Sequence, residues 1–129
     1  MVFEVKHTDL AARIATLETP HGVIETPAFL PVVHPVRQTI SPTFLKSLGF
    51  NAIITNAYIA LEHYGDGARK KGIHDIVNFD GVIMTDSGGY QVLEYGSIDI
   101  EANVIAQFEK EIGSDICVPL DRPTGYGLD

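Results

Sequence analysis

The residues best suited to chemistry lie together in one short segment, the run MTDSGGYQ at positions 84–91. It contains a carboxylate, a hydroxyl, two glycines and an aromatic ring, namely Asp86, Ser87, Gly88, Gly89 and Tyr90. Glycines let the backbone turn sharply and let a flat ligand approach it closely. The carboxylate offers charge and the ring offers a stacking face, so the segment indicates a site for a planar, hydrogen-bonding substrate such as a nucleobase.

Two further polar residues follow short apolar segments in the same way as Asp86. Asn56 comes directly after residues 51–55, and Asp121 comes directly after residues 116–120. The three polar residues lie 30 and 35 residues apart, which is the length of a strand–helix unit in a parallel α/β protein. Because the carboxyl ends of parallel strands meet at one rim, we expect these side chains to converge on a site.

The elements that position these residues are visible as patterns in the chain. Short β-branched runs predict strands at residues 28–33, 51–55, 81–84 and 116–120. A proline inside the first run weakens its strand pattern. Helices are predicted at residues 41–49, with a serine cap, a proline at the first position and a terminal glycine, and at residues 100–112. The apolar face of the second helix is formed by Val104, Ile105, Phe108 and Ile112.

These elements predict an α/β fold, the amino-terminal half of a TIM (β/α)8 barrel preceded by an antiparallel β-hairpin. The hairpin is expected at residues 1–26, with strands at 3–7 and 13–17 and a further turn at 19–22. Residues 27–129 then supply about four βα units, because a complete barrel needs roughly 200 residues or more. A doubly wound sheet would also place ligands at the strand ends, but no Gly-x-Gly-x-x-Gly turn is present.

Composition narrows the class of protein. The apolar share of 45% supports a core, and neither a signal peptide nor a membrane-spanning run is found, so we expect a cytoplasmic protein. The formal net charge of −8 argues against this chain alone holding a nucleic acid backbone. The single cysteine, Cys117, is expected to be a buried core residue. The histidines follow no metal-ligand spacing and are interpreted as surface or loop residues: His7, His21, His34, His63 and His74.

Each candidate residue also has a purely structural interpretation. Asp86 could cap the turn after its strand by accepting hydrogen bonds from the glycine amides. Tyr90 could pack in the core, and Asp121 could be a helix N-cap or a surface ion-pair partner. Asn56 could be the N-cap of a helix at residues 57–62, a role compatible with one in the site.

Several of these segments resemble the tRNA-guanine transglycosylase family. Residues 79–92 (FDGVIMTDSGGYQV) are similar to its signature, and residues 114–121 (SDICVPLD) are similar to its next strand. Residues 27–32 and 55–58 resemble two earlier family segments. The continuation at residues 93–96 (LEYG) is similar to the archaeal branch, which inserts 7-cyano-7-deazaguanine into the D-loop of tRNA as the precursor of archaeosine. The resemblance covers essentially the whole chain.

The resemblance implies a reaction and a role for each residue. A carboxylate attacks the anomeric carbon of a guanosine, guanine leaves, and a covalent ribosyl-enzyme receives the incoming base. Asp86 would be one of two catalytic aspartates, either the nucleophile or the acid/base. Tyr90 would stack on the base and Asp121 would accept hydrogen bonds from its N–H edge. Ser87 with the two glycines would shape the pocket, and Asn56 would orient a catalytic carboxylate.

The resemblance also implies parts that this chain lacks. In the family, the second catalytic aspartate, the Cys/Cys/Cys/His zinc site and the basic RNA-binding domain all come later in the sequence. We therefore expect no cofactor or metal in this chain and no turnover by it alone. Its expected partners are tRNA, the 7-deazaguanine base, and a companion carboxyl-terminal half or further copies of the chain. A non-catalytic guanine-binding module and an unrelated hydrolase using Asp86 and Asp121 are the alternative functions.

Overall fold

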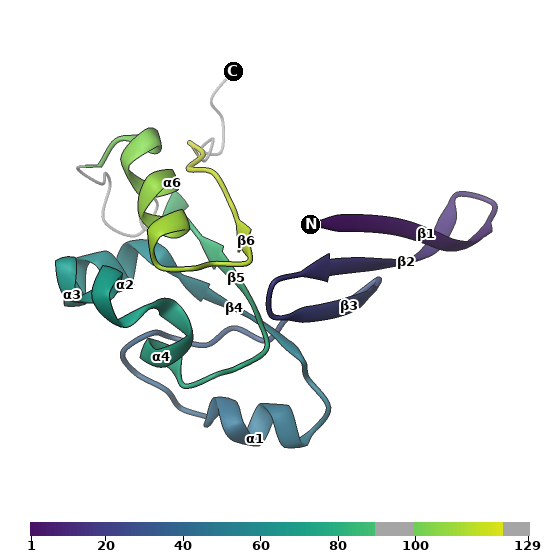
Figure 1. The fold of residues 1–129 in the computed structure, drawn as a ribbon, viewed down its shortest axis with the longest axis horizontal. Coiled ribbons are helices and arrows are strands. Elements are labelled where there is room, and N and C mark those ends of the chain that lie inside the picture. The colour runs from purple at the N-terminus through teal and green to yellow at the C-terminus, as the bar shows by residue number, and fades with distance from the viewer. Residues whose placement is uncertain (90–99, 123–129) are drawn as a thin grey trace, which may run out of the picture.

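The computed structural model describes residues 1–89 and 100–122. It contains a three-stranded antiparallel sheet and a three-stranded parallel sheet that is accompanied by helices (Figure 1). The antiparallel strands are β1 (Val2–Asp9), β2 (Ala12–Thr19) and β3 (Gly22–Thr26), in that order. The predicted hairpin is therefore confirmed, and the predicted turn at residues 19–22 leads into a third strand.

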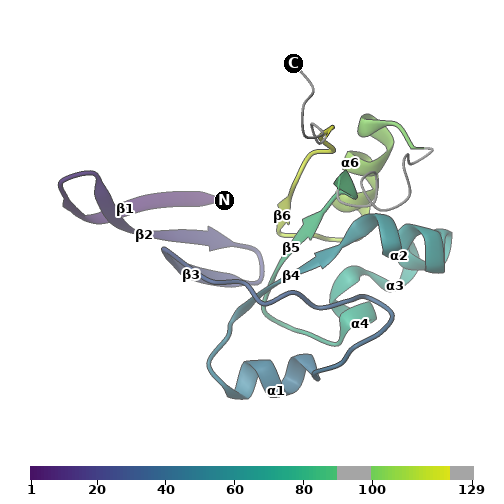
Figure 2. The same ribbon diagram turned by 180° about the vertical axis from the view of Figure 1, so that it is seen from behind.

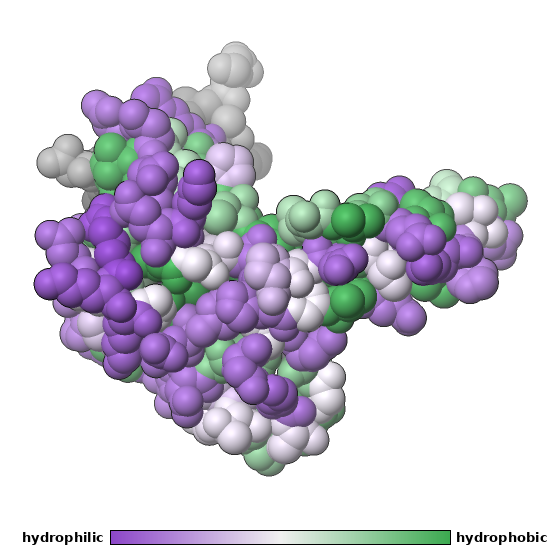
Figure 3. All heavy atoms as spheres, in the orientation of Figure 1, coloured by the Kyte–Doolittle hydropathy of each residue, from purple (hydrophilic) through white to green (hydrophobic). Residues whose placement is uncertain are grey.

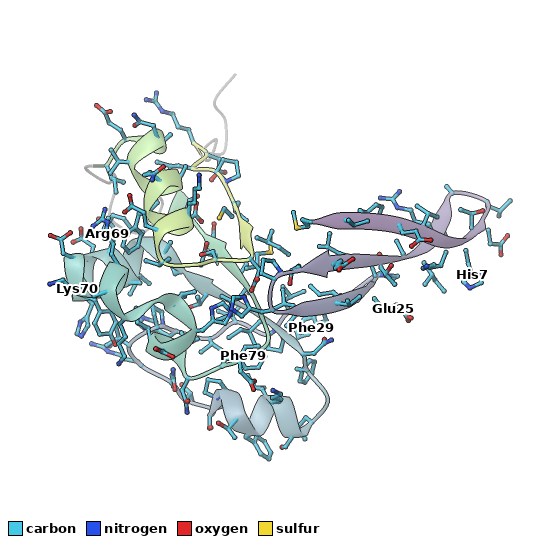
Figure 4. All side chains as sticks on the ribbon, viewed as in Figure 1. His7, Glu25, Phe29, Arg69, Lys70 and Phe79 are labelled. Atoms are coloured by element: carbon cyan, nitrogen blue, oxygen red, sulfur yellow. The ribbon has the colours of Figure 1, made fainter. Side chains whose placement is uncertain are left out.

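The antiparallel sheet projects away from the rest of the chain, and His7 and Glu25 lie on this projecting part (Figures 1 and 4). Apolar residues of β1 are exposed on it, including Phe3 and Val5 (Figure 3). Its attachment lies at the other end, where buried Ile24 of β3 packs against Ala52 and Val82. The sheet is thus fixed to the parallel strands where those strands begin.

The parallel sheet comprises β4 (Ala52–Asn56), β5 (Val82–Asp86) and β6 (Ile116–Cys117), hydrogen-bonded in chain order. Asn56 pairs with Asp86 in the parallel register. The strand predicted at residues 116–120 is shorter than expected, because after Val118, which donates its N–H to Thr85 O at 3.0 Å, comes a proline without an N–H.

The strand predicted at residues 28–33 was wrong in extent. The structure has a single parallel bridge between Val32 and Ile54, with Val33 N–H donating to Ile54 O at 2.8 Å. Pro31 contributes only its carbonyl, which accepts from Ile54 N–H at 3.0 Å. Proline has no N–H with which to continue a ladder, so the pairing stays local.

Most helices lie on one side of the parallel sheet, and the helix at Pro42–Ser47 lies apart from them, below the sheet in both views (Figures 1 and 2). The described helices are α1 (Pro42–Ser47), α2 (Ala57–Tyr64), α3 (Asp66–Lys71), α4 (Ile73–Val77) and α6 (Ala102–Glu111). The three helices expected from the sequence are present as α1, α2 and α6. Ser41 precedes α1, but its side chain makes no capping hydrogen bond. None of the described helices is long and apolar enough to cross a membrane.

The main core lies between these helices and the parallel sheet. Side chains alternate along a strand, so Ile53 and Ile83 face the helices while their neighbours face the other way. They pack with Ile105, Phe108 and Ile112, all of which are buried. The fourth residue of the predicted apolar face, Val104, is instead 44% exposed. Cys117 is also exposed, contrary to the prediction, because β6 is an edge of the described sheet.

Candidate functional site

The predicted rim exists where β4 and β5 end. Asn56 and Asp86 are the last residues of these neighbouring strands and are paired in register. Both line a cavity of about 300 Å³, together with residues of the Val32 bridge segment and of α2. The complete lining is Val32, Val33, His34, Pro35, Ile54, Thr55, Asn56, Ile59 and Asp86. The cavity is mostly apolar and includes a few polar groups in its lining, as small-molecule sites do.

The backbone holds both polar residues in place. Asp86 Oδ1 accepts a hydrogen bond from the N–H of Ser87 at 2.8 Å. Asn56 Oδ1 accepts one from the N–H of Ile59 at 2.9 Å, which makes Asn56 the N-cap of α2. The structural interpretation of Asn56 is thereby confirmed, and its position on the cavity keeps a role in the site open. Asp86 does cap its turn, but through the Ser87 amide rather than a glycine amide.

Asp121 lies against the turn that follows β5. Gly88 has φ +108°, a conformation that glycine adopts readily. At Gly89, an added Cβ would overlap the Oδ1 atom of Asp121. The absence of a side chain at this position therefore lets the Asp121 carboxylate approach the turn. Asp86 and Asp121, which are 35 residues apart in sequence, are brought to the same end of the sheet.

The remaining predicted residues are placed differently. Ser87 is fully buried and does not line the cavity. Its Oγ has no hydrogen-bond partner among the residues that the structure describes. In this conformation, then, Ser87 offers no surface to a ligand. Tyr90 lies outside the described residues.

His34 borders the cavity, and sequence reasoning missed it. Its Nδ1 accepts hydrogen bonds from the N–H groups of Val36 at 3.1 Å and Arg37 at 2.9 Å. A neutral imidazole so bound carries its proton on Nε2, which makes that atom a donor. Its loop location was predicted, but nothing in the spacing of the histidines indicates that this one lines a cavity.

A buried carboxyl group lies on the helix side of the same sheet. Glu109 of α6 is fully buried, and its Oε1 lies 2.8 Å from Thr85 Oγ1. Burial raises the pKa of the Glu109 carboxyl to about 7, against the lowering effect of the Thr85 hydrogen bond. The sequence did carry a signal for this residue, since Glu109 lies one turn after Ile105 on the apolar face of the helix.

A second polar cluster contains two histidines. His21 lies exposed in a turn, as expected, whereas His74 lies in α4 and is partly buried, contrary to the prediction. Asp115, just before β6, lies 2.7 Å from His21 Nδ1 and 3.2 Å from His74 Nε2, and its side chain is 1% exposed. The two imidazole rings stack with centroids 3.6 Å apart. His21 comes from the turn between β2 and β3 and His74 from α4, so the cluster joins the antiparallel sheet to the floor of the parallel one.

This cluster has ligand types that bind metals, and their donor atoms lie within 4.8 Å of one another. Its groups are already engaged, however. Asp115 Oδ2 accepts the N–H of Ile83 at 2.9 Å, and His74 Nε2 lies 3.0 Å from Gly81 O. We therefore interpret the cluster as a structural clasp.

Comparison with known proteins covers nearly the whole chain. The family model for queuine tRNA-ribosyltransferase matches residues 8–129. The chain belongs to this tRNA-guanine transglycosylase family. The family is enzymatic, and the names of its members describe transferases that modify tRNA.

The curated relatives compared with the chain come from archaea and share one name. The chain is 48% identical over 96% of its length to a tRNA-guanine(15) transglycosylase of Aeropyrum pernix. Proteins of the same name from Sulfolobus acidocaldarius and Methanosarcina mazei are 46% and 47% identical over 98% and 95% of the chain. The chain spans about a quarter of these relatives, 24%, 25% and 26% of their lengths.

A transglycosylase zinc site of the Cys/Cys/Cys/His type does not fit the part of the chain that the structure describes. It offers one cysteine, Cys117, which is exposed on the edge strand and has no histidine among its interacting groups. Although the residue is exposed, partial desolvation of its sulfur atom raises the pKa of the Cys117 thiol, with Glu109 and Asp115 acting in the same direction, and this disfavours the thiolate that metals bind. No step of the chemistry below involves a metal.

Proposed function

We propose that this chain carries part of the active site of a tRNA base-exchange transferase that replaces a guanine in tRNA with 7-cyano-7-deazaguanine. The observation that carries the proposal is that Asp86 ends β5 and Asp121 lies against the turn that follows it, where Gly89 leaves room for the second carboxylate. The relatives support the substrate class, since those compared are archaeal proteins named tRNA-guanine(15) transglycosylase.

Asp86 and Asp121 have different roles in the proposed reaction, catalysis and recognition of the base. A catalytic aspartate attacks C1′ of the guanosine, the C1′–N9 bond breaks, and guanine leaves with a proton supplied by an acid. The incoming base loses a proton, and its nitrogen displaces the aspartate from C1′. Asp86 is either this nucleophile or the acid/base. Asp121 accepts N–H groups from the guanine-like edge of the base, a recognition that suits a carboxylate.

Neighbouring groups complete the pocket. Asn56, on the strand beside Asp86, orients the catalytic carboxylate from its capped position. Tyr90 stacks on the base, as aromatic residues do with splayed-out RNA bases. Gly88 and Gly89 shape the turn that follows Asp86.

The fold proposed for the complete catalytic domain is a (β/α)8 barrel with this chain as its first part. The support is strand order. The Val32 bridge, β4, β5 and β6 follow one another in space as they do in sequence. In a doubly wound sheet the order reverses at a switch point, and that point is where ligands bind.

The remaining parts of the activity belong to a companion region or chain. The formal charge of −8 leaves the phosphate backbone of tRNA to be held by basic groups elsewhere. We assign to that companion the second catalytic aspartate and the zinc site, and we place the assembled enzyme in the cytoplasm.

A chimera provides the test. Residues 1–129 would replace the matching quarter of the Aeropyrum pernix relative, and incorporation of labelled 7-cyano-7-deazaguanine into tRNA would be measured. We expect exchange by the chimera and its loss by at least about 100-fold on Asp86→Asn. The control is Asp80→Asn, a substitution of an exposed aspartate at the other end of β5. A folded but inactive chimera, or an active Asp86→Asn variant, would refute the proposal.

A further inference from the structure

Glu109 is an acidic residue in an unusual place. It lies on the core side of α6, is 0% exposed, and directly follows Phe108 in the sequence of that helix. Its Oε1 meets Thr85 Oγ1, and the backbone N–H of Val118 lies near enough to lower its pKa, but its Oε2 is buried without a partner of hydrogen-bond geometry among the described residues. A buried, half-satisfied carboxylate is costly, so such a group usually has a reason to be kept.

The hydroxyl groups around Glu109 can adapt to its proton. Thr85 Oγ1 has two neighbours, Glu109 Oε1 at 2.8 Å and Ser114 Oγ at 2.9 Å, but one hydrogen to donate. When Glu109 is ionised, Thr85 must donate to it, and Ser114 can donate to Thr85. When Glu109 is protonated, it can donate to Thr85, and Thr85 can then donate to Ser114. The chain of hydrogen bonds thus supports both charge states by reversing its direction.

The strand places this network directly behind Asp86. Thr85 and Asp86 are consecutive in β5, so their side chains lie on opposite faces of the sheet. Thr85 points to Glu109, and Asp86 points to the cavity. Ser87, the next residue on the helix face, has a second buried and unpartnered oxygen. Two unsatisfied polar atoms therefore lie on the helix side of the strand end that carries Asp86.

Charges on the surrounding elements leave Glu109 uncompensated. Asp86 of β5 repels the Glu109 carboxylate. The Glu109 carboxylate in turn disfavours the thiolate form of Cys117 on β6. On α3, Arg69 lies over the Phe108 ring but is paired with Asp66 and Glu111.

The other charged groups nearby point elsewhere. On α2, Glu62 and His63 are exposed, and the Tyr64 hydroxyl donates to Pro35 O at 3.4 Å. Lys110, the next residue on α6 itself, is exposed. No cation among the described residues is paired with Glu109.

We propose that Glu109 is a positioning residue that acts on Asp86 through the sheet, by holding Thr85 and by adding or withdrawing a negative charge behind the catalytic carboxylate. The inference deepens the proposed function, because it rests on Asp86 being catalytic. Burial raises the pKa of Glu109 to about 7, with repulsion from Asp86 acting in the same direction. The charge behind Asp86 consequently changes near neutral pH.

Carboxyl NMR tests the coupling without any assay of base exchange. The chain would be labelled with ¹³C at its aspartate and glutamate carboxyls and titrated from about pH 4 to about pH 9. We expect the Glu109 resonance to have its midpoint near pH 7 and the Asp86 resonance to show an inflection at the same pH. In Glu109→Gln, the inflection at Asp86 should vanish, and in Asp86→Asn the midpoint of Glu109 should move to lower pH.

The matched control is Glu111→Gln on the same helix, whose carboxylate pairs with Arg69 and should leave both curves unchanged. The proposal fails if Glu109 of the unaltered chain titrates near the ordinary glutamate value of about 4.3. It also fails if the Asp86 curve has no inflection where Glu109 titrates. Both results come from the unaltered chain, so they are available even if a variant does not fold. Coupling without base exchange in the chimera would refute the proposed function alone.

Discussion

Asn56 and Asp86 occupy paired positions at the ends of two adjacent parallel strands and line the same cavity. Neighbouring strands lie about 4.8 Å apart, so the amide and the carboxylate are held side by side by the backbone itself. Asn56 is fixed a second time by capping α2 through Ile59. Asn56, the N-cap of α2, thus also lies beside Asp86, the carboxylate to which we assign a catalytic role.

This double role predicts that stability and activity separate at position 56. Asn56→Ala should lose the cap and about 1 kcal/mol of unfolding free energy, as measured by urea denaturation. Asn56→Asp keeps a capping oxygen and should retain stability. In the chimera, however, it places a second negative charge beside Asp86, so base exchange should fall. Full exchange by Asn56→Asp would show that the amide has no role beyond the cap.

The contact between Gly89 and Asp121 predicts a second effect. Gly89→Ala adds a methyl group where Asp121 Oδ1 lies, so the carboxylate must move away from the turn. In the chimera, we expect the affinity for 7-cyano-7-deazaguanine, measured by calorimetry, to fall by about tenfold or more, a loss on the scale of one charged hydrogen bond.

Gly67→Ala is the matched control for that substitution. Gly67 lies inside α3, and a methyl group there would meet nothing within 4 Å. Alanine favours helix more than glycine does, by up to about 1 kcal/mol, so this variant should be no less stable and should bind the base unchanged. Equal affinities for the Gly89 and Gly67 variants would contradict the role given to Asp121.

The elements that the sequence predicted well are those set by local pattern. β4, β5, α2 and α6 follow apolar periodicity, and the polar residues at the strand ends of β4 and β5 do meet as the parallel arrangement requires. The sequence overestimated the strand at residues 28–33, since its proline removes a donor. It also misplaced Cys117, because burial of an edge strand depends on which element covers it.

What the sequence could not give were contacts between distant segments. His21 and Asp115 are 94 residues apart, and neither spacing nor composition indicates that they meet. Placing Glu109 required knowing that α6 turns this residue toward Thr85 and not toward solvent. Both are results of tertiary packing.

The clasp of His21, His74 and Asp115 predicts that stability depends on pH. Burial first, and repulsion by His21 second, lower the pKa of His74 below its usual 6.5 in the folded chain. The neutral form is therefore the one that folding favours. Stability should be complete above the unfolded value of about 6.5 and should fall as the pH drops through the lowered folded pKa.

Thermal unfolding checks this dependence. His74→Gln should lower the melting temperature at neutral pH and reduce the loss of stability between neutral and mildly acidic pH. His63→Gln, which changes an exposed histidine of α2, should keep the dependence of the unaltered chain. An identical acid dependence in the His74 variant would mean that another group causes it.

Glu109 predicts the opposite trend in a higher range of pH. Its folded pKa, about 7, lies above its usual value of 4.5, so the folded chain holds a proton that the unfolded chain has lost. The unfolding free energy should therefore decrease as the pH rises from about 4.5 to about 7, and then level off. Glu109→Gln remains neutral and removes this loss, so it should be more stable than the unaltered chain at pH 8, by up to about 3 kcal/mol.

Urea denaturation at pH 5 and pH 8 measures the difference, with Glu111→Gln as the control that should show no such gain. If the stability gain of Glu109→Gln over the unaltered chain is no larger at pH 8 than at pH 5, the buried carboxyl is already ionised in the folded chain at pH 5.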